Sequence, residues 1–224
     1  MVNEIAWRQL KEELDRLNVT LVAVSKTKPV EDILTLYELG QRDFGENYVQ
    51  ELVAKQPSLP EDVKWHYIGH LQSNKVKLIA SFVHLIHAVD SLKLLEEINR
   101  QGAKHGRVID VLLQMHIADE DTKFGLAAEE IESICTSVQR NKDAFDHVRI
   151  CGLMGMASFT DDEQKIASEF RSLRETFLSI QQHYFGDLTH FKQCSMGMSS
   201  DYKIAINEGS SMVRVGSLLF GSRN

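Results

Sequence analysis

Residues 21–39 read LVAVSKTKPVEDILTLYEL and join a short apolar run to an amphipathic helical pattern. The run Leu21–Ser25 has the length and composition of a buried strand, and Val30–Leu39 has its apolar residues at helical spacing. The side chains that share one helix face are Ile33, Leu34, Leu36 and Tyr37. A strand followed by an amphipathic helix is the repeating unit of a parallel sheet, so this stretch predicts an α/β fold.

The same unit recurs along the chain. The eight apolar runs are Leu21–Ser25, Asp43–Asn47, Trp65–Gly69, Leu85–Asp90, Ile109–Ile117, Val148–Met156, His190–Met196 and Met212–Phe220. Helical patterns lie between them, and the apolar stripe of Asp162–Tyr184 is formed by Ile166, Phe170, Leu173, Phe177 and Ile180. Eight parallel strands joined by right-handed crossovers favour closure into a (β/α)8 TIM barrel over an open sheet.

The two ends of the chain refine this prediction. The eighth run stops near the C-terminus, so we expect no eighth helix after it. An additional N-terminal helix over Asn3–Leu17 is expected to cover the gap left there. Because the chain has only 3 prolines and no Gly/Ser-rich linker, we predict one domain over residues 1–224.

Composition excludes several classes of function. The chain has 25 basic and 32 acidic residues and no long Lys/Arg cluster, which argues against binding to nucleic acid or a membrane surface. It shows neither a secretory signal nor an apolar run of the roughly 20 residues that span a bilayer. The 3 cysteines, Cys135, Cys151 and Cys194, form neither a zinc pattern nor a disulfide framework, so we predict a cytoplasmic protein.

Function in such barrels collects at the carboxyl ends of the strands. Beyond the first strand, Val22, Val24, Lys26 and Lys28 share a face, which places Lys26 at the mouth of the barrel. Burial and a second cation nearby disfavour the ammonium form of such a lysine, and a free amine attacks an aldehyde. The alternative is a solvated lysine in an ordinary loop.

The second and third strand ends are less specific. Asn47 is a candidate to hydrogen-bond a ligand, or it caps the following helix. His66 and His70 are four residues apart, but they flank a strand end and lack the adjacent carboxylate of a zinc protease motif. We therefore expect no metal site, and we place His70 at the mouth of the barrel.

The seventh and eighth strand ends carry the features of an anion site. Ser199 and Ser200 precede a predicted helix and offer hydroxyls and helix amides, while Gly216 permits close approach of the backbone and Ser217 adds a hydroxyl. Phosphate sites in these barrels are frequently built from the loops after strands seven and eight. An amine nucleophile opposite a phosphate site describes a pocket for pyridoxal 5′-phosphate.

Six segments then carry a family resemblance. They are AVSKTKP at 23–29, FGENYVQE at 44–51, WHYIG at 65–69, LQSNK at 71–75, GMSSD at 197–201 and VRVGS at 213–217. In this order they resemble the pyridoxal phosphate homeostasis protein family, a relative of the alanine racemase N-terminal barrel. The resemblance implies that Lys26 holds the cofactor as a Schiff base and that Ser199, Gly216 and Ser217 bind its phosphate. It also implies that Arg214 faces the pyridine nitrogen and that Asn47 lies at the pocket.

The resemblance implies a protein that stores, delivers or buffers pyridoxal phosphate, with apo-forms of pyridoxal phosphate enzymes as possible partners and little catalysis of its own. Alanine racemase has a further C-terminal domain that supplies a catalytic tyrosine, and we expect that base to be absent here. Tyr48 or His70 would have to replace it. The alternatives are a pyridoxal phosphate-dependent amino-acid racemase and a barrel for other phosphorylated metabolites.

Overall fold

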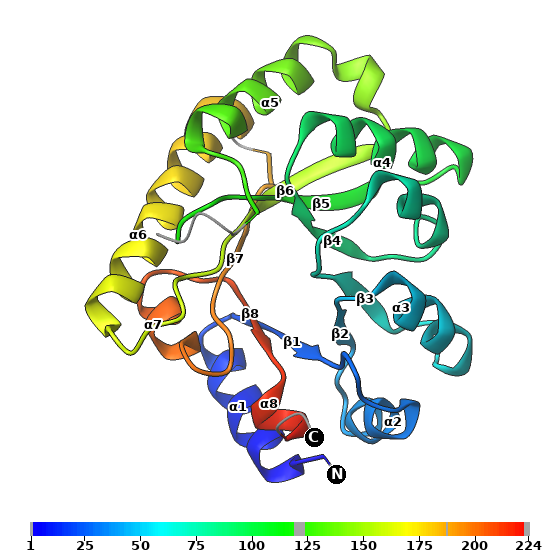
Figure 1. Ribbon diagram of the computed structural model, residues 1–224, viewed down its shortest axis with the longest axis vertical. Coiled ribbons are helices and arrows are strands. Elements are labelled where there is room, and N and C mark those ends of the chain that lie inside the picture. Colours follow the sequence, from blue (N-terminus) through cyan, green and yellow to red (C-terminus); the bar gives the residue numbers. More distant parts are fainter. Residues whose placement is uncertain (1, 119–123, 187, 222–224) are drawn as a thin grey trace.

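A closed ring of eight parallel strands forms the centre of the computed structural model, which describes residues 2–118, 124–186 and 188–221 (Figure 1). The strands are β1 (Thr20–Val24), β2 (Asp43–Glu46), β3 (Lys64–Tyr67), β4 (Leu85–Val89), β5 (Ile109–Gln114), β6 (Val148–Met154), β7 (Gln193–Ser195) and β8 (Met212–Val215). Each pairs with the next along the chain, and β8 closes the ring against β1. The predicted (β/α)8 barrel is confirmed.

Helices surround the ring. They are α1 (Glu4–Arg16), α2 (Val30–Glu38), α3 (Val49–Lys55), α4 (Leu92–Lys104), α5 (Ala128–Arg140), α6 (Glu163–Ile180), α7 (Tyr202–Asn207) and α8 (Ser217–Phe220). A 3₁₀ helix, Ser73–Leu78, joins β3 to β4, shorter 3₁₀ turns cover Gln56–Ser58 and Lys142–Phe145, and a π turn, Gln181–Phe185, extends α6. Within the described residues, no helix is both long and apolar enough to cross a bilayer.

Two separate apolar clusters hold the barrel together. One lies between the strands and the helices, where the α6 stripe from Ile166 to Ile180 is buried as predicted. The other fills the inside of the ring and consists of Val22, Leu85, Ala88, Leu112, Cys151, Met154 and Met212. Side chains alternate between the two faces of each strand, so residues such as Phe44 and Trp65 point outward and their sequence neighbours point inward. The inner face is the one that reaches the mouth of the barrel.

The expectation of no eighth helix is wrong. β8 ends at Val215, and α8 follows as a single turn over Ser217–Phe220. The apolar residues at 218–220 fit a strand or a buried helical turn equally well, which is why the sequence pattern did not separate them. The N-terminal helix is confirmed as α1, and it packs on β1 and α8, where Asn3 N donates to Leu219 O at 2.8 Å. Figure 1 shows α1 beside α8.

Candidate functional site

A cavity of about 570 Å³ opens at the carboxyl ends of the strands. It is lined by the six residues that the sequence predicts as cofactor-binding: Lys26, Asn47, Ser199, Arg214, Gly216 and Ser217. Val24, Ile68, Met156, Met198 and Leu218 add an apolar part to the wall. The structure therefore brings together residues that are up to 191 positions apart in the chain, from Lys26 to Ser217.

Lys26 directly follows Ser25, whose backbone and side chain are held by the buried pair of Glu46 and Lys55. Ser25 Oγ donates to Glu46 Oε1 at 2.6 Å, and Lys55 Nζ donates to Ser25 O at 2.8 Å and to Glu46 Oε1 at 2.8 Å. Thr27 adopts φ +64°, a conformation uncommon for a residue with a side chain, and its amide donates to Glu51 Oε1. These contacts fix the direction in which Lys26 leaves β1.

Burial raises the pKa of Glu46 above its usual value, although Lys55 and Ser25 act in the opposite direction. Its second oxygen, Oε2, is buried and has no hydrogen-bond partner among the described residues. The carboxyl group is thus held in place through one oxygen only.

Lys28 lines the same cavity, but its ammonium group is engaged at the edge. Lys28 Nζ donates to Phe220 O at 2.8 Å and thereby ties the loop after β1 to the end of α8. Lys28 is thus bound to the backbone at the edge of the cavity, although the period of two places it on the same face as Lys26.

Arg214 is a buried cation at the floor of the cavity, with 4% of its surface exposed. Its guanidinium donates to Ser195 O at 2.9 Å, to Ser195 Oγ at 2.6 Å and to Gly155 O at 2.9 Å. Burial lowers the pKa of Arg214 to about 10, which still leaves the group cationic at neutral pH. A fixed cation at this position cannot accept a proton from a ligand.

A chain of hydrogen bonds continues from Arg214 through the inside of the barrel. Ser195 Oγ lies 3.2 Å from His87 Nδ1, His87 Nε2 lies 2.9 Å from His66 Nδ1, and His66 Nε2 lies 2.9 Å from Asp43 Oδ1. Burial holds the pKa of His87 well below its usual value, so its ring is neutral. Because Arg214 only donates and the Asp43 carboxylate only accepts, neutral imidazoles satisfy the chain when every bond donates toward Asp43.

The loops after β7 and β8 meet directly. Gly216 N donates to Ser199 Oγ at 3.2 Å, and Ser217 follows as the first residue of α8. A Cβ atom at position 216 would lie 3.2 Å from Val24 O and 3.3 Å from Val24 Cβ, so the backbone approaches β1 closely there. The helix α7 begins at Tyr202, so Ser199 and Ser200 precede it, as predicted, and their amides lie ahead of its first turn.

Asn47 does not cap the next helix. The residue before α3 is Tyr48, and no side chain caps that end. Asn47 Oδ1 is buried without a hydrogen-bond partner among the described residues, while Asn47 O accepts from Tyr67 Oη at 3.0 Å. A Cβ atom at Gly69 would lie 2.3 Å from Asn47 O, so glycine is required where these two loops touch. Asn47 thus lines the cavity and carries a buried acceptor without a partner among the described residues.

The two residues considered as substitute bases lie elsewhere. Tyr48 is 55% exposed and precedes α3, and His70 pairs with Asp90 at 3.1 Å and stacks on Phe124. Neither lines the cavity, and no histidine, tyrosine or carboxylate is found among its described lining residues. His66 is buried inside the barrel, away from His70 and the mouth.

The sequence pattern did not identify Ser195, which accepts from Arg214, or His87, which contacts Ser195. The available signal was the position of each polar residue within an otherwise apolar strand, such as His87 in LIHAV at 85–89. A polar side chain in such a strand requires a buried partner.

The barrel and the cavity at its mouth agree with a known protein family. The family described as alanine racemase, N-terminal domain, matches residues 5–224 of this chain. A protein from Schizosaccharomyces pombe named pyridoxal phosphate homeostasis protein is 39% identical over 218 residues, which cover 96% of this chain and 89% of that protein. One of the same name from Aquifex aeolicus is 38% identical over 204 residues, covering 91% and 86%.

The chain belongs to the pyridoxal phosphate homeostasis protein family, within the alanine racemase N-terminal domain family. Solved structures agree with this assignment. PipY from Synechococcus elongatus is 34% identical, with 96% of this chain and 98% of PipY covered. The TM-score is 0.89 for PipY without pyridoxal phosphate and 0.84 for PipY with pyridoxal phosphate bound.

Proposed function

We propose that this protein binds pyridoxal 5′-phosphate, held as a Schiff base on Lys26, and stores, delivers or buffers it. The observation that carries the proposal is the convergence of a lysine, a buried arginine and the Ser199–Gly216–Ser217 cluster in one cavity. The membership of the family and the bound ligand of PipY support it. Bound pyridoxal phosphate supplies an aldehyde, which a lysine amine attacks.

The residues present fit this ligand. The buried Asn47 Oδ1 has no partner among the described residues and offers an acceptor, and Ser199, Gly216 and Ser217 line the cavity together, where they would hold a phosphate. Arg214, cationic at neutral pH, would face the pyridine nitrogen and keep it unprotonated. A ring nitrogen without a proton is a weak electron sink, which favours carriage over catalysis.

We further propose that the protein works without robust catalysis and passes its ligand to apo-forms of pyridoxal phosphate enzymes. A cavity whose described lining has no histidine, tyrosine or carboxylate offers few groups for proton abstraction, which disfavours the racemase alternative. Three free buried cysteines support a reducing compartment, and we propose the cytoplasm.

Borohydride reduction tests the covalent link. Reduction of the pyridoxal phosphate-loaded protein should fix the ligand on Lys26, as read by peptide mass mapping. The Lys26→Ala protein should yield no adduct, whereas Lys28→Ala, the matched control from the same face, should retain it. An adduct on Lys28 of the wild-type protein would overturn the assignment.

A comparison of two ligands tests the phosphate site. Charge-assisted hydrogen bonds contribute about 1.5–3 kcal/mol each, so two or three of them separate pyridoxal phosphate from pyridoxal by orders of magnitude in affinity. The aldehyde is common to both ligands and does not discriminate. Titration of cofactor-free protein with each ligand measures the difference. Affinities within about tenfold, or 1.4 kcal/mol, would rule out the proposed phosphate site.

A further inference from the structure

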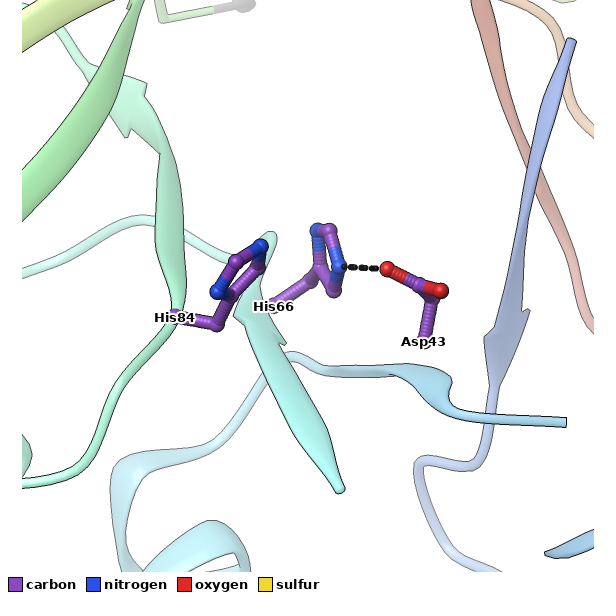
Figure 2. Close-up of side chains that lie close together, drawn as sticks. All are labelled: Asp43, His66 and His84. Carbon is purple, nitrogen blue, oxygen red and sulfur yellow. Dashed lines mark hydrogen bonds and ion pairs between the residues drawn. The ribbon is translucent and has the colours of Figure 1, made fainter. Parts of the chain in front are cut away.

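A second polar cavity, of about 440 Å³, lies at the opposite end of the barrel, where the strands begin. Asp43 opens β2, His66 is the third residue of β3, and His84 directly precedes β4. Figure 2 shows the three side chains pointing toward one another, with the His66 ring between His84 and Asp43. One potential ligand atom from each residue lies within 4.8 Å of the others.

We propose that Asp43, His66 and His84 form a binding site for a divalent transition metal such as zinc. Two imidazoles and one carboxylate make a ligand set that zinc accepts, with a further position left for water or an anion. The set lacks the several oxygen ligands that calcium or magnesium requires. From the sequence we expected no metal site, and we considered His66 only together with His70.

The distances suit a metal with small side-chain adjustments. Two ligand atoms on one tetrahedral zinc lie ~3.3 Å apart, as follows from bond lengths of about 2.0–2.1 Å. His66 Nε2 and Asp43 Oδ1 are 2.9 Å apart, and the three ligand atoms spread over no more than 4.8 Å. His84 is the exposed member, so its ring has room to turn.

The backbone under the three ligands is fixed by the barrel itself. Asp43 is in register with Lys64, and His66 is in register with Leu85. His84 N donates to Trp65 O at 2.9 Å. Sites on such paired strands are more precise than sites on loops.

The support behind His66 matches that of a metal ligand. A histidine that binds a metal through one nitrogen donates the other N–H to a neighbouring acceptor. His66 Nδ1 has such a neighbour in His87 Nε2 at 2.9 Å, and His87 is fully buried. A metal at Nε2 replaces the proton that His66 otherwise shares with Asp43, so the proton resides on Nδ1 and is donated to His87. Ser195 Oγ, with two lone pairs, accepts from both His87 and Arg214.

The charges around the site determine what completes it. Lys64 and Lys192 line the cavity, as does Arg149, which is paired with Asp110 at 2.7 Å. These cations repel a metal ion such as calcium or magnesium, which binds mainly through its charge. They disfavour less strongly a transition metal that forms bonds to imidazole nitrogens. They also favour an anion, such as chloride or hydroxide, at the open position.

Zinc binding to the full chain tests the proposal. Chelator-treated protein is titrated with zinc against a chromophoric chelator, and we expect one zinc per chain. His84→Ala and Asp43→Asn should each weaken binding more than about tenfold, because even a residue behind the ligands contributes 10–100-fold. His105→Ala, which removes an exposed histidine of α4's end, is the matched control and should bind like the wild type.

Cobalt(II) provides a second readout, because a four-coordinate site with nitrogen ligands gives intense visible bands that a surface-bound ion does not. Those bands should appear with wild-type protein and be lost in both ligand variants, with folding checked by circular dichroism. Absence of zinc binding, or equal weakening by His105→Ala, would overturn the proposal. Because the metal alone is the probe, failure here leaves the proposed pyridoxal phosphate function intact.

Discussion

Gly216 has no side chain, and this allows the loop after β8 to approach Val24 of β1 closely at the wall of the cavity. A Cβ atom there would lie 3.2 Å from Val24 O, so alanine requires a small shift and valine a much larger one. We expect Gly216→Ala to fold and to bind pyridoxal phosphate more weakly, and Gly216→Val to lose binding. Equilibrium titration and circular dichroism measure both. Wild-type affinity in the folded valine variant would contradict this explanation.

Glu46 links the site to pH. Its folded-state pKa is raised by burial, so the folded protein holds this proton more tightly than the unfolded chain does. The stabilising contribution is full below the unfolded pKa and is lost as pH rises through the folded value. Relative to wild type, Glu46→Gln should therefore gain stability as the pH rises above the ordinary glutamate pKa of about 4.3, as measured by urea unfolding. A difference that stays constant, or reverses, would show that Lys55 dominates the pKa of Glu46.

On the scale of elements, Arg214 compensates for a short pairing. Only one residue pair, Ser195 with Met212, is in register between β7 and β8. The guanidinium of Arg214 bridges from β8 to Ser195 of β7 and to Gly155 after β6. The side chain thus joins three neighbouring strands where their ladder is weakest.

Ser195→Ala tests this bridge. It removes the hydroxyl that accepts from Arg214 at 2.6 Å, and we expect the free energy of unfolding to fall by about 1.5–3 kcal/mol, the range for a hydrogen bond to a charged group. Ser211→Ala, which removes a bond to the neutral amide of Cys194, is the control and should cost only about 0.5–1.5 kcal/mol. Equal losses would indicate that Arg214 draws no special support from Ser195.

Much of the element order was predictable from the sequence because each strand is a compact apolar run and each helix has a clear stripe. The mouth residues were predictable because parallel strands place their carboxyl ends together. The chain of hydrogen bonds through Ser195, His87, His66 and Asp43 was not predictable, because it depends on which face of a strand buried on both sides turns inward. The Asp43–His66–His84 cluster was not predicted for a related reason: its members lie on or directly before three different strands and have no common spacing.

For the whole molecule, the described lining of the cavity predicts little catalytic activity. We expect amino-acid racemisation by the loaded protein to be negligible beside the turnover of about 1–1000 per second that is usual for enzymes. A chiral assay over several amino acids measures it, with Lys26→Ala as the background. Turnover in the enzyme range that disappears in Lys26→Ala would restore the racemase alternative.

The pairing of β1 with β8 also fixes when the protein becomes functional. Val22 of the first strand is in register with Arg214 of the last, so the cavity lies across the seam that closes the ring. During synthesis, Lys26 leaves the ribosome 188 residues before Arg214 of β8. A nascent chain therefore has no ligand site until β8 has emerged and paired with β1. Ligand binding stabilises only the closed ring. Rising cofactor levels should therefore protect chains in which β8 has paired with β1, while chains that have not closed the ring remain exposed to proteases.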